Sequence, residues 1–180
     1  MREPMTPAQA EFWLQEVLLP LVKNESRITK SVLEAIPSSG SDYRPDPHAK
    51  SAIELAWHIA SAERRFLDTV INANFDATPV PRPDSIGTGG EVACWYAEFF
   101  DDRFPKLTQL QGDHLIKLVD FRGLFQWPAV AFLQLAVVHS VHHRGQLSTY
   151  LRPAGGRVPA IYGESYDSAE ARKAAQAQAS

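Results

Sequence analysis

Cysteine is nearly absent from this sequence, since Cys94 is the single one among 180 residues. One cysteine cannot form a disulfide within the chain, so the fold must depend on an apolar core. A chain of this length can bury such a core as one domain. We therefore expect the reducing environment of the cytoplasm, and we expect Cys94 to be a small buried side chain.

Long apolar runs are also lacking. The most apolar stretch, residues 127–141, is interrupted by Gln134, His139 and Ser140 and falls short of the roughly 20 residues that a membrane span requires. Residues 1–7 show no basic segment followed by an apolar one, as a secretion signal would. We expect no membrane partner.

Blocks of one charge sign are the third absence. The chain has 18 basic and 21 acidic residues, for a formal net charge of -3. Such a balance, spread along the chain, does not produce the basic surface that follows a phosphate backbone. Nucleic acid is therefore not an expected partner, and a small molecule is.

What the sequence does contain is apolar residues at helical spacing. Four long segments show it, residues 6–36, 51–74, 91–110 and 128–151, and they predict an all-α four-helix bundle. Ser51 and Glu54 have the spacing of a capping box at the start of the second segment. Pro20 is expected to kink or break the first.

The remaining segments have weaker patterns. Residues 112–126 suit either a short hairpin or an irregular crossover, and we treat them as a connection. We expect one domain over residues 1–167. Residues 168–180, rich in alanine and glutamine, are expected to be a frayed helix or disordered.

Histidines on two of these helices carry the chemistry. His139 and His143 are four residues apart, so a helix presents both rings on one face, one turn apart. His58 lies within the apolar stripe of the second helix. Three imidazoles bind zinc, nickel or ferrous iron and leave a coordination position open for water or substrate, which is typical of catalytic sites.

A structural interpretation competes with each of these assignments. A buried histidine is more often hydrogen-bonded in a core than bound to metal. His142 points away from the focus of the pair, and His48 and His114, which lie in connections, are expected at the surface. Glu54 could orient a ligand, but its capping position already explains it. Gln146, one turn beyond His143, could hydrogen-bond a ligand or remain structural.

Two parts of the chain, in the expected order, resemble the DinB family. Residues 139–152, with Gly155 and residues 159–163, are similar to its closing signature. Residues 42–45 and 54–60 resemble its second-helix region. The combination of a histidine on the second helix with the segment His-x-x-x-His-Arg-Gly-Gln is specific, far more so than either part alone.

The resemblance implies a bundle of the DinB/YfiT type, in up-down-down-up order with a long crossover, and a metal held by His58, His139 and His143. It also implies a homodimer. Some related metal enzymes transfer low-molecular-weight thiols to electrophiles, so it suggests a metal-dependent transferase or hydrolase in stress response or detoxification. A non-catalytic metal-binding or ligand-binding bundle is the alternative. Arg144 is expected to have a structural role, and Tyr43 and Tyr162 either close over the metal or simply pack.

Overall fold

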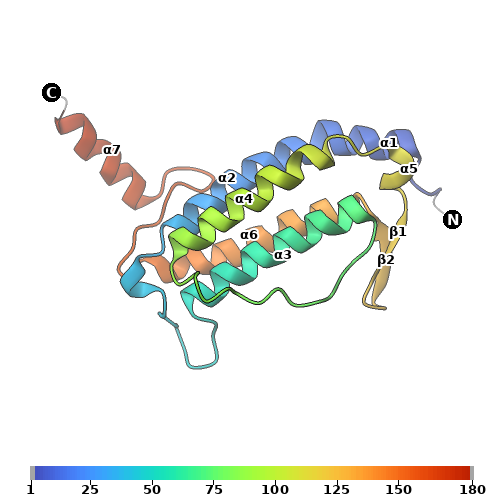
Figure 1. Cartoon of the computed structure of the whole chain (residues 1–180). Coiled ribbons are helices and arrows are strands. Elements are labelled where there is room, and N and C mark those ends of the chain that lie inside the picture. The colour runs from blue at the N-terminus through green and yellow to red at the C-terminus, as the bar shows by residue number, and fades with distance from the viewer. Residues whose placement is uncertain (1–2, 179–180) are drawn as a thin grey trace.

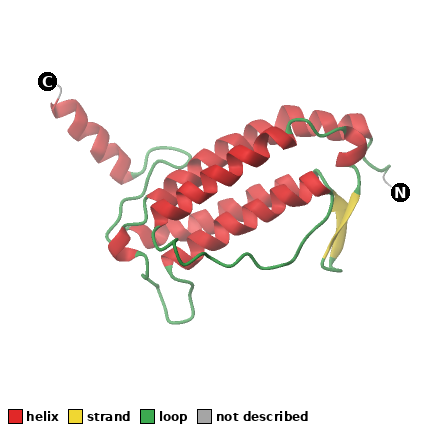
Figure 2. Cartoon of the chain, in the orientation of Figure 1, coloured by secondary structure: helices red, strands yellow, loops and turns green. Residues whose placement is uncertain are grey.

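The structure is a computed structural model that describes residues 3–178 (Figure 1). Its long helices are connected by loops, by short helical segments and by a hairpin (Figure 2). The elements are α1 (Pro7–Phe12), η1 (Trp13–Leu18), α2 (Leu19–Glu34), η2 (Ser38–Gly40), α3 (Ala52–Asn72), α4 (Gly89–Leu107), α5 (Gly112–Leu115), β1 (Leu118–Phe121), β2 (Phe125–Pro128), α6 (Ala131–Leu151) and α7 (Tyr166–Gln178).

Four long helices pack side by side. α2 contacts α4 and α6, and α3 contacts the same two helices. Figure 1 shows α3 and α4 running in the same direction, so residues 73–88 must return along the length of α3 before α4 begins. This return segment lies over one side of α3. It becomes important for the site.

Three of the helices begin with the local chemistry that their sequences indicate. α1, α3 and α4 each start with a complete capping box, in which the N-cap hydroxyl and the third helical side chain satisfy each other's backbone amides. The prediction of a capping box at Ser51 and Glu54 is confirmed. α4 also begins at a close approach, because a Cβ on Gly89 would overlap the carbonyl of Leu33 on α2.

Pro20 does not break the first helix. It lies inside a continuous helix, where its missing N–H removes one backbone hydrogen bond, and the chain just before it is π-helical over Trp13–Leu18. The wider turn takes up the irregularity, so α1, η1 and α2 form one continuous rod (Figure 1).

The all-α prediction is wrong in one detail. Within residues 112–126, treated above as a connection, the chain forms the short helix α5 and most of a hairpin. β1 and β2 pair antiparallel, with Leu118 opposite Pro128 and Phe121 opposite Phe125. Asp120 accepts a hydrogen bond from the N–H of Gly123, which has a positive φ. Of the two alternatives for this stretch, a short hairpin and an irregular crossover, the hairpin forms, closed by a tight turn.

The expected burial of Cys94 is also wrong, since the thiol is exposed. α4 packs through Val92, Ala93, Tyr96 and Phe99, which leaves Cys94 and Glu98 on its outer face. The apolar neighbours of Cys94 in the sequence did not indicate that its side chain lies on the outer face of the helix.

The core contains one large charged side chain, Arg144 of α6, which is 1% exposed. Its guanidinium donates to Glu25 Oε2 at 2.5 Å, to the Glu25 carbonyl at 3.1 Å and to Thr29 Oγ1 at 3.0 Å. It also donates to the Tyr162 hydroxyl at 2.6 Å, which in turn donates to Glu25. This network joins α6, α2 and the segment after α6, so the expected structural role of Arg144 agrees with its contacts.

The C-terminal segment forms a further helix. α7 starts at Tyr166 and is regular to Gln178, although none of its residues is buried and it projects away from the other helices (Figure 1). Residues 179–180 of the predicted tail lie outside the described residues. Within residues 3–178, no helix combines the length and apolarity that crossing a bilayer demands.

Replacing Glu25 with alanine tests the buried pair. Glu25→Ala leaves the Arg144 charge in the core without its carboxylate, which is expected to lower the free energy of unfolding by about 3 kcal/mol. The measurement is urea unfolding followed by circular dichroism. Glu34→Ala on the same helix breaks the exposed ion pair to Lys30 and serves as the control, with an expected loss of about 0.5 kcal/mol. Equal losses would contradict the prediction.

Candidate metal centre

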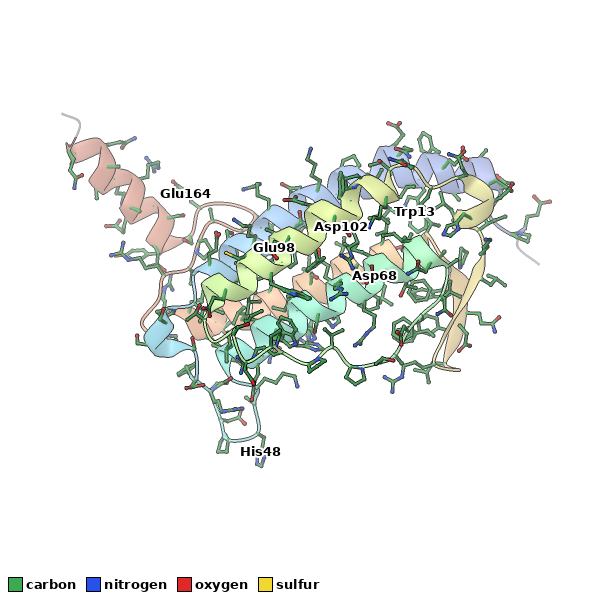
Figure 3. All side chains as sticks on the ribbon, in the orientation of Figure 1. Trp13, His48, Asp68, Glu98, Asp102 and Glu164 are labelled. Atoms are coloured by element: carbon green, nitrogen blue, oxygen red, sulfur yellow. The ribbon has the colours of Figure 1, made fainter. Side chains whose placement is uncertain are left out.

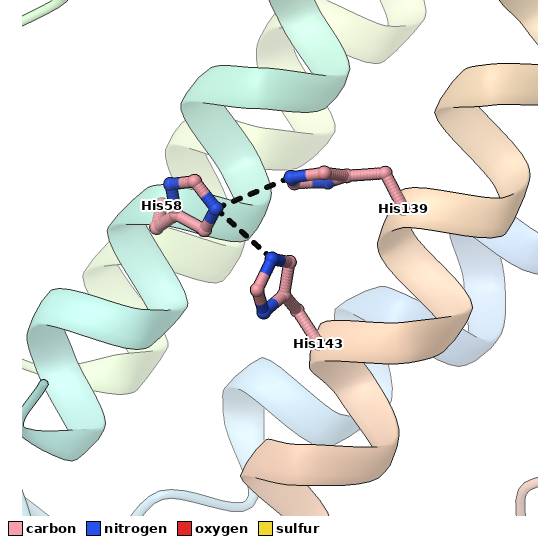
Figure 4. Close-up of side chains that lie close together, drawn as sticks. All are labelled: His58, His139 and His143. Atoms are coloured by element: carbon pink, nitrogen blue, oxygen red, sulfur yellow. Dashed lines mark hydrogen bonds between the residues drawn. The ribbon is translucent and has the colours of Figure 1, made fainter. Parts of the chain in front are cut away.

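The structure brings His58, His139 and His143 together. His58 comes from α3, and the other two come from consecutive turns of α6 (Figure 4). Nε2 of His58 lies 3.1 Å from Nε2 of His143 and 3.2 Å from Nε2 of His139. One ligand atom from each ring lies within 4.8 Å of the others, so the three form a group that could hold a metal ion.

This convergence follows from how α3 and α6 pack. Leu55, Ile59 and Phe66 of α3 are buried, which turns the adjacent His58 toward α6. On α6, Ser140 and Arg144 face the core, so His139 and His143 stand one position away, half-buried at its edge. The Phe66 ring packs against His139 in a T-shaped arrangement, with ring centroids 5.6 Å apart.

Burial keeps two of the rings neutral. Desolvation lowers the pKa of His58 from 6.5 to about 4, with a further contribution from the nearby His143. Desolvation likewise lowers the pKa of His139 to about 3, helped by His143 and His58. Neutral imidazole is the form that binds metal, so both rings are in the ligand state at neutral pH.

Gln146 fixes the orientation of the third ring. Its Oε1 accepts a hydrogen bond from Nδ1 of His143 at 3.1 Å, while its amide nitrogen donates to the Tyr150 hydroxyl. A proton on Nδ1 leaves the lone pair of Nε2 directed at the cluster. This is the hydrogen-bond partner that metal-binding histidines usually have. Nδ1 of His139 is buried without a partner among the described residues, so His139 departs from that pattern.

The positions of the three ring nitrogens suit coordination of a shared cation better than hydrogen bonding among the rings. A ring nitrogen is either donor or acceptor, and the proton of His143 is on Nδ1, so separate hydrogen bonds cannot satisfy both contacts of His58. Ligands on a tetrahedral metal with bonds of about 2.0–2.1 Å lie ~3.3 Å apart. The separations of 3.1 and 3.2 Å are close to that value.

The other candidate residues lie elsewhere. Glu54 closes the capping box and accepts from Arg44 at 2.9 Å, which together lower its pKa. His142 is exposed, and His48 is at the tip of the loop before α3 (Figure 3). His114 is half-buried, contrary to expectation, because its Nε2 lies 2.8 Å from the Val70 carbonyl at the end of α3.

The two tyrosines do not face the histidines as a pair. Tyr43 packs edge-on against Tyr150, with ring centroids 5.8 Å apart, so it supports the residue that holds Gln146. Tyr162 lies over Arg144, 5.3 Å from its guanidinium carbon. Packing against Tyr150 explains Tyr43, and the hydrogen bonds with Arg144 and Glu25 explain Tyr162.

Sequence reasoning missed Glu63, a carboxylate on α3 that is 5% exposed. It accepts from Tyr96 Oη at 2.5 Å and from Ser140 Oγ at 2.6 Å, and burial raises its pKa. Ser140 directly follows His139, so Glu63 fixes α6 at the level of the cluster. The burial of Glu63 could have been predicted from its position, because it lies four residues after Ile59 and four before Leu67, on the buried face of the helix.

A pocket of about 430 Å³ opens beside His58. α3 and the return segment enclose it. Its lining comprises Lys50, Glu54, Trp57, His58, Ser61, Ala62, Arg65, Pro79 and Val80. One of the three imidazoles is therefore accessible to a small molecule.

Acid is expected to destabilise the metal-free protein through these rings. The folded-state pKa values of His58 and His139 lie below their unfolded value of 6.5. Their contribution to stability is therefore complete above pH 6.5 and is lost as the pH falls toward 4 and 3. Urea unfolding after chelation, at pH 7.5 and pH 4.5, measures this. His139→Gln should weaken the pH dependence, whereas His48→Gln, at an exposed position, should leave it unchanged. An unchanged dependence in His139→Gln would contradict the assignment.

Comparisons with known proteins agree with the resemblance in the sequence. YjoA, an uncharacterized protein of Bacillus subtilis strain 168, is 28% identical over 128 residues, which cover 71% of this chain and 82% of YjoA. YrdA, an uncharacterized protein of the same strain, is 31% identical over 113 residues, 61% of this chain and 64% of YrdA.

Two crystal structures share the fold. That of the DinB-like YjoA superposes with a TM-score of 0.65 at 24% identity, covering 82% of this chain and 99% of YjoA. That of a DinB-like protein from Bacillus cereus ATCC 10987 gives 0.68 at 25% identity, covering 82% and 97%. The family model of the DinB family matches residues 9–177. The chain therefore belongs to the DinB family.

Proposed function

We propose that this protein is a divalent-metal-dependent enzyme, with zinc, nickel or iron held by His58, His139 and His143. We further propose that it transfers a low-molecular-weight thiol to a small electrophile, in stress response or detoxification. The observation that carries the proposal is the pocket beside His58, since a sealed cluster would favour a purely structural or ligand-sensing role.

The residues present have distinct tasks in such an enzyme. His58, His139 and His143 supply three neutral nitrogens, and Gln146 holds the His143 ring in the required tautomer. Phe66 packs against the His139 ring and helps to hold it in place. When bound, a divalent ion with an open position lowers the pKa of a thiol or a water molecule there.

The proposed reaction is a substitution at carbon. The thiol gives up its proton to solvent, and a sulfur–carbon bond forms as the bond to the leaving group breaks, with its electron pair going to the leaving group. The pocket holds the electrophile beside His58. Within the described residues, no carboxylate contacts the three rings, so we assign no general base among the side chains.

We also propose that the four long helices form a four-helix bundle of the DinB type that dimerises in the cytoplasm. Each of α2 and α3 contacts both α4 and α6, which supports the bundle. The sequence of α6 is apolar on nearly all sides, yet Val138 is 57% exposed and Trp127, just before α6, is 42% exposed. A second copy would cover these side chains.

Metal content tests the proposal directly. Elemental mass spectrometry of untagged protein should find about one metal ion per chain, and His58→Ala, His139→Ala and His143→Ala should each lose it. His142→Ala and His48→Ala are the matched controls and should retain the metal, because neither ring joins the cluster. Absence of metal after reconstitution would overturn the proposal.

The loaded protein is then assayed with thiols and an alkylating electrophile. Turnover abolished by His58→Ala is expected, and retained metal without any turnover would favour the non-catalytic alternative.

Gln146 is expected to tune the site without being a ligand. Gln146→Leu removes the acceptor for Nδ1 of His143, and loss of such a partner typically weakens metal binding 10- to 100-fold. Competition with a chromophoric chelator measures the affinity. Thr149→Val, on the exposed side of the same helix, should leave it unchanged. An affinity that does not change in Gln146→Leu would show that the hydrogen bond has no role in binding.

A further inference from the structure

We propose that the pocket beside His58 selects small organic anions, with Lys50 and Arg65 binding a carboxylate of the substrate. This rests on the proposed function and deepens it, because it names the chemical class that the metal site would accept. The argument uses the charges that line the pocket, their partners and the rigidity of its wall.

Two cations line the pocket without a carboxylate partner. The Lys50 ammonium makes no hydrogen bond or ion pair with any residue from 3 to 178. Arg65 makes one hydrogen bond, from Nη2 to the Thr78 carbonyl at 3.0 Å, which leaves most of its five N–H donors for a ligand. Most other basic side chains near α3 are already paired, such as Arg64 and Arg103 with Asp68.

The one acidic residue in the lining does not neutralise them. Glu54 is held by the Ser51 amide on one oxygen and by Arg44 at 2.9 Å on the other. Asp76 lies in an adjoining hollow of about 330 Å³, where it accepts from the Thr78 amide. The hydrogen bonds with Thr78 and the charge of Arg65 lower the pKa of Asp76, but no ion pair joins Asp76 to Arg65. Within the described residues, the lining thus has two cations without an ion-pair partner and one carboxylate that is already paired with Arg44.

The pocket is built before a ligand arrives. Arg65 holds Thr78, and Nε1 of Trp57 donates to the Val80 carbonyl at 2.9 Å, so two side chains of α3 fix the return segment in place. The Trp57 ring is itself packed against Trp95, with centroids 4.5 Å apart. A preformed wall means that little ordering is needed on binding.

The spacing along α3 sets the size of the substrate. Arg65 is two helical turns after His58, roughly 10 Å along the axis, and Lys50 directly precedes Ser51, the N-cap of α3. Both long side chains line the space between. A ligand with its donor atom near His58 therefore presents a carboxylate to either cation when the two groups are a few bonds apart.

Cobalt-loaded protein provides a test with an optical readout. We would titrate it with 3-mercaptopropionate and with its uncharged amide, 3-mercaptopropanamide, and follow the absorbance of the sulfur-to-cobalt transition. The acid is expected to bind about tenfold more tightly than the amide, as one charge-assisted hydrogen bond allows. This preference should shrink as salt is added.

Variants test which residues cause the preference for the acid over the amide. Lys50→Gln and Arg65→Gln should each lower the ratio in part, because the other cation still binds the carboxylate, while affinity for the amide is kept. Lys117→Gln, an exposed lysine before the hairpin, is the matched control and should retain the full ratio. Equal affinities in the wild type, binding of neither thiol, or an unchanged ratio in both pocket variants would overturn the anion site while cobalt remains bound. Failure to bind cobalt would instead overturn the proposed function.

Discussion

The packing of α3 against α6 forces three imidazoles to share one small volume, and the site depends on this constraint. Rings with nitrogens about 3 Å apart cannot carry several positive charges, so they must be neutral or share a cation. Desolvation and mutual repulsion act in the same direction on His58 and His139. The fold therefore supplies the protonation state that a metal requires, at the expense of stability in acid.

Buried polar contacts hold the two helices in the necessary register. Glu63 joins α3 to Ser140 of α6 and to Tyr96 of α4, while Arg144 joins α6 to Glu25 of α2. Ser140 and Arg144 each follow a histidine of the cluster by one position. Residues that face the core thus fix the direction of their neighbours at its edge. A purely apolar core would fill the same space without fixing the rotation of α6 so narrowly.

The part of the candidate site that could be predicted from sequence lies within one helix. His139 and His143 form a pair at helical spacing, and Gln146 lies on the same side, so their meeting could be predicted from α6 alone. Glu63 and Glu25 could not be predicted as network members, because their partners Ser140 and Arg144 are 77 and 119 residues away. The hairpin was one of two alternatives for residues 112–126, and strands of four residues are too short for an alternating pattern to decide between them.

Topology explains why the pocket lies where it does. α3 and α4 run in the same direction, so the chain must return along the length of α3 over residues 73–88. That segment has little regular structure of its own and is anchored through Thr78 and Val80 to side chains of α3. It forms the outer wall beside His58. The ligand set is fixed by two rigid helices, whereas the wall is a loop whose residues can change without disturbing the core. For the proposed enzyme, substrate choice could therefore vary on this fold without a change in the three histidines.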